Sequence, residues 1–324
     1  VSLLRKLVSD PEERWVFAGM VVIAANAGGA WTPIGDVTTT MLWIGSRLTT
    51  LSMMKALVLP SLACTIVPAV ILGFKLKGEV QTAAPGNGDG DGNSNGTREV
   101  VTQRERTLVF VLAMLALLFV PIFKTITHLP PYMGILLGLG VLWVVTEVMH
   151  GGKNREVRRP LSIGGVLERV DTSSVLFFLG ILLAVSALST GGHLTQVGEW
   201  LNAHLGNTTA INVVIGFLSA VIDNVPLVAG AMKMYPLTTP DQLAAIAPGQ
   251  AAWLSQFVED GHFWELLAYC AGTGGSCLII GSAAGVAAMS LEKIHFFWYV
   301  RKISFCATLG YLSGVLVFVA LQAV

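Results

Sequence analysis

Stretches of about 20 mostly apolar residues recur along this chain, and they constrain its fold more than any other feature. A helix needs about 20 such residues to cross the hydrocarbon core of a bilayer. Only 12% of the 324 residues are charged and the mean hydropathy is +0.69, whereas soluble domains carry about 25% charged residues. We therefore predict an all-α integral membrane protein. The candidate segments, several of them interrupted by glycine or proline, are 15–45, 56–74, 107–127, 131–149, 173–191, 208–235, 263–290 and 303–323.

Charge and cysteine placement exclude several other classes of protein. The chain carries 20 basic and 20 acidic residues, so it offers no basic field for nucleic acid. Cys64, Cys270, Cys277 and Cys306 lie in apolar stretches without metal-ligand spacing, and we expect buried thiols there. No nucleophile–base pair or set of metal ligands stands out, so we expect neither an enzyme nor a bound cofactor.

A segment rich in glycine, asparagine and aspartate divides the chain. It has almost no apolar side chains to bury, and we predict a flexible linker. Basic residues gather in this segment and again in 151–170, with two predicted spans between them. Both loops then lie on the same side, which the positive-inside rule makes cytoplasmic or its organellar equivalent. The expected organisation is the end of a first repeat at 1–74, the linker at 75–106 and a second repeat at 107–324.

A motif near the start of the chain recurs near its end. Gly28 and Gly35 match Gly274 and Gly281, each 246 positions later (274 minus 28, and 281 minus 35). Internal repeats in membrane proteins often mark secondary transporters, with the substrate site near the midplane between the two halves. The repeats can be parallel or inverted, and we favour an inverted-repeat transporter with discontinuous helices.

An inverted arrangement makes a demand on segment 208–235. An odd number of crossings must separate residue 75 from the C-terminus, so this segment should be a re-entrant hairpin with its tip near Pro226. The matching hairpin of the first repeat would precede Val1. Because the chain also opens on a polar stretch, we expect an N-terminal truncation.

Residues 26–40 combine helix breakers with oxygen ligands. A Gly-Gly pair and a Thr-Pro pair break a helix in an apolar setting, which frees backbone groups that must be satisfied within lipid. A carboxylate and hydroxyls follow the break, and such hard oxygen ligands suit Na⁺ or Li⁺. The alternative is that the glycines only allow close helix packing and the threonines bond back to their own helix. The candidate site residues here are Asn26, Thr32, Asp36, Thr38 and Thr39.

Three further groups of polar residues lie in or beside apolar segments. An acid within a membrane segment is a functional candidate by default; Asp223 can bind a cation when ionised and a proton when neutral. A hairpin tip that faces water is the alternative for Asp223. The repeat partner of the first motif offers hydroxyls without a carboxylate, and a helix N-cap is the favoured interpretation of Asp171 and Thr172. The other candidates are Ser219, Asn224, Thr273, Ser276 and Ser282.

These motifs resemble those of the NhaD-type sodium/proton antiporters, a family within the ion transporter superfamily. Residues 26–40 and 219–226 carry the resemblance, 273–285 support it, and it covers nearly the whole chain outside the linker. It implies exchange of Na⁺ or Li⁺ for H⁺ between two inverted halves by alternating access. We expect the ions to bind alternately at Asp223, helped by Asp36 and Asn224. The family's polar positions fall on Asn26, Asp36, Thr38, Thr39, Asp171, Thr172, Ser219, Asp223, Asn224, Ser276 and Ser282.

The resemblance also bears on membrane and partners. The Thr-Pro version of the first motif resembles plant and algal members, which sit in the chloroplast envelope, whereas bacterial members sit in the inner membrane. Expected partners are membrane lipid, monovalent cations and a second copy of the chain in a homodimer. A dicarboxylate or arsenite carrier on the same fold is the alternative, but buried acids favour a cation because anions prefer helix N-termini. A fragment that folds without transporting is a further alternative.

Overall fold

The computed structural model is built from helices, and it contains no strand in the residues that it describes. These are residues 4–75, 101–127, 129–154, 158, 161–167, 172–245 and 248–323. The chain forms two compact units, one made of Val1–Ala84 and Leu179–Val324 and the other of Pro85–Phe178. Most of the predicted linker lies outside the described residues. At its edges, Lys75 still belongs to one helix and Gln103 already begins the next.

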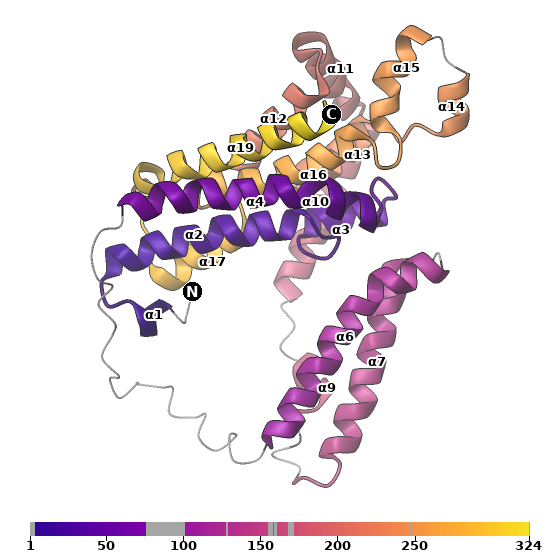
Figure 1. Ribbon diagram of the computed structural model, residues 1–324. Helices are drawn as coiled ribbons and strands as arrows, with labels where there is room; N and C mark the ends of the chain where they lie inside the picture. Colours follow the sequence, from indigo (N-terminus) through magenta and orange to yellow (C-terminus); the bar gives the residue numbers. More distant parts are fainter. Residues whose placement is uncertain are drawn as a thin grey trace. The chain divides into compact units, whose positions relative to one another are not determined.

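The larger unit holds most of the helices (Figure 1). They are α1 (Leu4–Leu7), α2 (Pro11–Ala30), α3 (Val37–Ile44), α4 (Thr50–Lys75), α11 (His193–Leu205), α12 (Thr208–Ser219), α13 (Asn224–Met234), α14 (Pro240–Ala244), α15 (Pro248–Leu254), α16 (His262–Gly274), α17 (Ala283–Glu292), α18 (Phe296–Tyr299) and α19 (Phe305–Gln322). Short 3₁₀ turns at Ser255–Phe257 and Gly275–Cys277 and a π-helical turn at Val300–Ser304 join some of them. The smaller unit contains α6 (Gln103–Thr127), α7 (Pro131–His150) and α9 (Ile163–Leu167), and α10 (Thr172–Thr190) begins there and ends in the larger unit.

Four helical segments of the described chain are long and apolar enough to cross a membrane. They are Thr50–Phe74, Gln103–Thr127, Pro131–His150 and Phe296–Gln322. Only 6% of the most apolar window of α6 is buried by the described protein. The prediction of an all-α integral membrane protein is confirmed.

Three other apolar segments are broken helices, and the breaks match the predicted positions in part. The Thr32–Pro33 pair lies in the first break and α16 ends at Gly274, both as predicted. Helix α2 continues through Gly28 and Gly29 to Ala30, because a glycine inside a helix costs only about 1 kcal/mol. A Cβ added at Gly29 would lie 2.8 Å from the carbonyl oxygen of Gly35, so this glycine lets the chain after the break approach the helix. Similarly, Pro226 is not the interruption of 208–235. It lies in the first turn of α13, where a proline needs no N–H donor.

Segment 208–235 turns back on itself. The Asn212 side chain on α12 donates to the carbonyl of Phe263 at 3.0 Å, and the ring of Tyr235, just after α13, lies 4.7 Å from the ring of Phe263. Both ends of the segment therefore lie at the start of α16. The end of α12 reaches further along α16, where the Ser219 hydroxyl donates to the Ala271 carbonyl at 2.8 Å. This is the hairpin geometry that the sequence analysis expects.

Helix α4 lies between α2 and α19 and packs most extensively on α19 (Figure 1). Glycines make this approach close, since a Cβ added at Gly310 would lie 2.5 Å from the carbonyl oxygen of Cys64. Such small residues are typical of helix contacts in membranes. All four cysteines are buried free thiols, as predicted.

Candidate functional site

Each of the three helix breaks ends in a side chain that caps the next helix. Asp36, Asp223 and Ser282 are the N-caps of α3, α13 and α17. Their side-chain oxygens accept hydrogen bonds from backbone N–H groups of the first turns, at 2.6, 3.3 and 3.1 Å respectively. Asp and Ser are preferred N-caps, so these predicted site residues also determine where each helix starts.

The carboxylate of Asp36 joins the first break to the hairpin. Its Oδ2 atom accepts a hydrogen bond from the Thr38 hydroxyl at 2.8 Å and another from the Asn224 side-chain amide at 3.0 Å. Asn224 is the first residue of α13, so the contact brings together residues 188 positions apart. Asp223, directly before it, is close enough to act electrostatically on Asp36. The structure thus gathers four of the predicted site residues.

The side chain of Asn26 forms a second polar cluster. Its amide nitrogen donates to the Ser276 hydroxyl at 2.8 Å and to the Ser282 hydroxyl at 2.9 Å. This side chain on α2 therefore reaches both ends of the break between α16 and α17. We call it the second break because it is the repeat partner of the first break, between α2 and α3. The buried Tyr299 hydroxyl donates to the backbone carbonyl of Ser276 at 2.9 Å. No motif in the sequence indicated Tyr299, since it lies well beyond the break.

Other predicted residues serve the backbone. The hydroxyls of Ser219 and Thr273 donate to carbonyls of α16 at 2.8 and 2.6 Å. Thr39 completes a capping box with Asp36, and its hydroxyl donates to the Asp36 carbonyl at 2.9 Å. The carbonyl of Thr32 accepts the N–H of Gly35 at 3.2 Å within the break. For Thr39, this matches the alternative in which the threonines of residues 26–40 bond back to their own helix.

Thr40 is a site-forming residue that the sequence interpretation missed. Its hydroxyl donates to the carbonyls of Pro33 and Asp36, at 2.8 and 2.9 Å. It thereby satisfies two backbone acceptors near the break, which the apolar surroundings demand. The run of three threonines was the available signal, but only the first two were selected.

Two predicted residues are not part of these clusters. Asp171 lies outside the described residues. Thr172 is the exposed first residue of α10 and belongs to the smaller unit. Across the described residues, no group of three or more His, Cys, Asp or Glu side chains is arranged to hold a metal ion. The two clusters instead present carboxylates, amides and hydroxyls.

The two breaks at the repeat positions have the same backbone geometry. The N–H of Gly35 donates to the carbonyl three residues earlier at 3.2 Å, and the N–H of Gly281, 246 positions later, does the same at 3.1 Å. The capping residues Asp36 and Ser282 are both extended, with φ of −141° and −149°. The two breaks therefore share this turn hydrogen bond and an extended capping residue.

Contacts between the breaks also come in exchanged pairs. Asn26 contacts Ser276. Subtracting the repeat offset of 246 from 276 gives Ala30, and adding it to 26 gives Gly272. A Cβ added at Gly272 would lie 3.3 Å from the Cβ of Ala30, so this second pair is also in contact. Exchange of this kind is what a two-fold relation between two segments produces.

Comparison with known families agrees with this architecture. Residues 2–256 match the family described as citrate transporter. This chain belongs to the citrate transporter family. It is 48% identical over 322 residues to "Sodium/proton antiporter 1" of Arabidopsis thaliana, covering 99% of this chain and 51% of that protein. It is 47% identical over 322 residues to "Sodium/proton antiporter 2" of the same plant, covering 99% and 71%.

Relatives of lower identity include bacterial proteins. The "Na(+)/H(+) antiporter NhaD" of Alkalimonas amylolytica is 28% identical over 325 residues, covering 94% of this chain and 60% of that protein. The chain spans about half the length of the first plant relative. No solved structure matches it. The match to a family of transporters and the relatives named NhaD both agree with the resemblance predicted from the sequence.

Proposed function

We propose that this protein exchanges Na⁺ or Li⁺ for H⁺ across a membrane by alternating access. The observation that carries the proposal is the Asp36 carboxylate, which is held by Thr38 and by Asn224 from the hairpin. It joins two discontinuous segments at a point where a bound cation could influence both. The printed names of the plant and bacterial relatives are those of antiporters of these ions. Transport, not catalysis, is the activity proposed.

The charge of the caps supports a cation rather than an anion. A helix N-terminus normally attracts anions through its free N–H groups and its dipole. Here first-turn N–H groups of α3 and α13 are occupied by the carboxylates of Asp36 and Asp223. Across the described residues, neither carboxylate forms an ion pair. The family description names citrate, so an anion carrier is the second candidate, but two unpaired carboxylates would repel citrate.

Exchange follows if cation and proton compete for the same oxygens. In the ionised form, Asp36 and Asp223 present negative charge, and the carbonyl oxygen of the Asn224 amide supplies a neutral ligand. Protonation of a carboxylate removes its charge and releases the cation. The site then carries the cation to one side of the membrane and the proton to the other. We assign Asp36, Asp223 and Asn224 as Na⁺ ligands, with the Asn26–Ser276–Ser282 cluster supporting the second break.

The exchanged contacts support an inverted repeat as the basis of alternating access. A two-fold axis within the membrane plane would make the two openings of the site equivalent. Rocking of the broken helices would then expose the Asp36 carboxylate first to one side and then to the other. This arrangement stays a proposal, as does a homodimer.

The direct test uses the full-length protein in proteoliposomes containing a pH-sensitive dye. An imposed Na⁺ gradient should drive proton movement in the native protein. Asp36→Asn and Asp223→Asn should abolish it, and Asp241→Asn, at an exposed acid on α14, should leave it unchanged. Full exchange in both of the first two variants would refute the proposed site. Uptake of labelled citrate without proton–sodium exchange would favour the anion carrier.

The membrane of residence follows from the more similar relatives. The two relatives at 47–48% identity come from a plant, whereas the NhaD relatives at 27–30% identity are bacterial. We propose the plant-type location, the chloroplast envelope, with a bacterial inner membrane as the alternative. A fluorescent fusion of the full-length protein in plant cells tests this, and signal at another membrane would contradict it.

A further inference from the structure

A pocket of about 390 Å³ opens at the start of α2, beside the end of α4 and the π-helical turn Val300–Ser304. It is separate from the breaks and from the transported ions. Its lining carries both signs of charge. The acids come from the N-cap and first turn of α2, and the bases come from the π-helical turn. The charged lining residues are Asp10, Glu12, Glu13, Arg301 and Lys302.

These opposite charges share a pocket without pairing. In the described part of the chain, neither Arg301 nor Lys302 forms an ion pair with an acid. Acids in a first turn stabilise a helix through its dipole, which accounts for Glu12 and Glu13 alone. It does not account for two bases lining the same pocket. A ligand that carries both a positive and a negative group would neutralise both sets.

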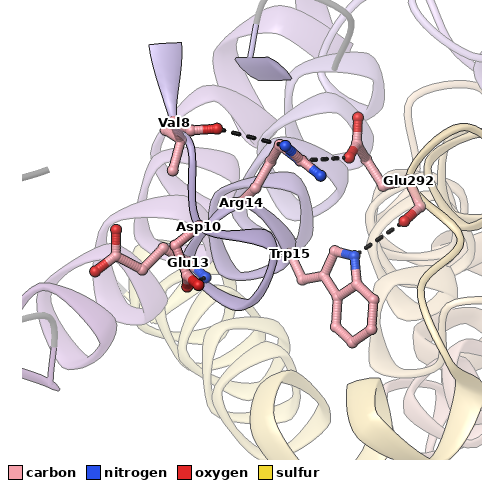
Figure 2. Close-up of polar contacts among 6 residues, drawn as sticks. All are labelled: Val8, Asp10, Glu13, Arg14, Trp15 and Glu292. Atoms are coloured by element: carbon pink, nitrogen blue, oxygen red, sulfur yellow. Dashed lines mark hydrogen bonds and ion pairs between the residues drawn. The ribbon is translucent and has the colours of Figure 1, made fainter. Parts of the chain in front are cut away.

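The neighbouring basic residue of α2 is committed elsewhere. Arg14 donates to the carboxylate of Glu292 at 2.7 Å, and the Trp15 indole donates to the backbone carbonyl of Glu292 at 2.9 Å. Figure 2 shows both side chains directed toward Glu292, while Asp10 and Glu13 lie together on another side of α2. Arg14 therefore leaves the acids of the pocket unpaired.

Apolar residues complete the pocket. Val16, Leu72 and Trp298 supply its apolar lining. The Trp298 indole nitrogen has essentially no accessible surface, so the ring presents carbon atoms to the pocket. The Trp298 ring packs edge-on against Trp15, with 5.2 Å between centroids, which fixes its position.

Large apolar side chains on α4 and on the helices that flank the π-helical turn are exposed. Phe74 on α4 is 78% exposed, Phe297 on α18 is 82% exposed and Phe305 on α19 is 67% exposed. Tryptophans such as Trp15 and Trp298 are typical of the level of lipid headgroups. The charged pocket therefore adjoins a surface suited to acyl chains.

We propose that this pocket binds a zwitterionic phospholipid through its headgroup. The phosphate lies against Arg301 and Lys302, which are the side chains that favour phosphate oxygens. The ammonium group lies against Glu12 and Glu13. The acyl chains follow the exposed phenylalanines.

Native mass spectrometry of the full-length protein tests this, with phosphatidylethanolamine and phosphatidylglycerol added separately to delipidated samples. We expect phosphatidylethanolamine to bind at least about tenfold more tightly and to raise the thermal unfolding midpoint. Equal binding of the two lipids would overturn the zwitterion assignment. Glycerophosphoethanolamine, the headgroup without chains, should bind far more weakly. Equal binding of this soluble headgroup would instead indicate a soluble zwitterion and overturn the lipid assignment.

Two double variants test the basic and the acidic side chains of the pocket separately. Arg301→Gln with Lys302→Gln should weaken the binding of phosphatidylethanolamine, because its phosphate loses both bases. Glu12→Gln with Glu13→Gln should reverse the preference in favour of the anionic lipid, because the two bases then outnumber the remaining acid, Asp10. Lys55→Gln is the matched control, since Lys55 is the exposed residue 246 positions before Arg301 and does not line the pocket. If the first double variant keeps the native affinity and the second keeps the native preference, both while folded by circular dichroism, the pocket does not select the lipid.

Discussion

The two repeat-related breaks share a backbone but present different side chains. The first break combines a carboxylate with hydroxyls, whereas the second has one hydroxyl at its cap and apolar residues after it. The difference is reversed on the preceding helices, where α2 carries an amide and α16 a glycine. The paired positions are Asp36 and Ser282, Thr38 and Ala284, Thr40 and Val286, and Asn26 and Gly272.

This contrast shows how a duplicated break can acquire an asymmetric site. The Asn26 amide spans the second break by donating to both Ser276 and Ser282. At the corresponding place beside the first break there is no side chain, because Gly272 stands there. A Cβ added at Gly272 would lie 3.6 Å from Oδ2 of Asp36. One half therefore places an amide at a position where the other half has no side chain beside a carboxylate.

Removing the charge of the first break should have the largest effect. Asp36→Asn keeps a good N-cap but removes the negative charge, and we expect exchange to fall by about 100-fold or more, which is about 2.7 kcal/mol. Ser282→Asn makes a similar cap at the second break without changing charge, and it should reduce exchange less than about tenfold. Proton–sodium exchange in proteoliposomes measures both. Equal losses in the two variants would contradict an asymmetric site.

Two glycines near the breaks should differ sharply in their tolerance of a methyl group. At Gly281 an added Cβ would lie 2.7 Å from the Cα of Ala220 and from the carbonyl oxygen of Gly275, so Gly281→Ala should destabilise the protein by about 1–3 kcal/mol. At Gly28 nothing lies within 4 Å of the added atom. Because Gly28 is inside α2, Gly28→Ala should be neutral or stabilising by up to about 1 kcal/mol.

Thermal unfolding midpoints in detergent measure this pair of variants. A matched loss of stability in Gly28→Ala would show that this glycine is also needed at the break. An unchanged midpoint in Gly281→Ala would mean that the close backbone contact at the second break can relax.

The sequence predicted the features that depend on local pattern. Apolar length predicted the spans, and the constant offset predicted that the two breaks correspond. It located the breaks only in part, because Thr32–Pro33 lies in the first break and α16 ends at Gly274, whereas Gly28 and Gly29 are helical and Pro226 lies in a first turn. The caps at Asp36 and Ser282 fix the helix starts, a role that the sequence pattern did not indicate.

Contacts across the chain were beyond such patterns. The sequence selected Asp36 and Asn224 separately, but nothing in it indicated that the amide of one donates to the carboxylate of the other. That contact depends on how α13 packs against α3, which is a result of the whole fold. The same holds for Tyr299, whose hydroxyl reaches a carbonyl 23 positions earlier.

Placing an amide side chain beside Asp36 should have an intermediate effect on exchange. Gly272→Asn would copy the arrangement of Asn26, and its amide would donate to the Asp36 carboxylate in competition with the cation. One hydrogen bond to a charged group is worth about 1.5 kcal/mol, so the Na⁺ concentration for half-maximal exchange should rise about tenfold. Gly272→Ala is the control, since its Cβ would meet Ala30 at 3.3 Å without adding a donor. An unchanged Na⁺ dependence in a folded Gly272→Asn protein would place the cation elsewhere.

The smallest effect is expected at Thr40, because the corresponding position of the second break already carries a residue without a hydroxyl. Thr40→Val installs the residue that stands 246 positions later, Val286, and removes the hydrogen bonds to the carbonyls of Pro33 and Asp36. Valine has nearly the same shape, so only those bonds are lost, at about 1 kcal/mol. The unfolding midpoint should fall by a few degrees while the Na⁺ dependence of exchange stays as in the native protein. If exchange is lost while the midpoint is kept, the Thr40 hydroxyl belongs to the ion site itself, and the two breaks differ in one more ligand than the carboxylate and Thr38.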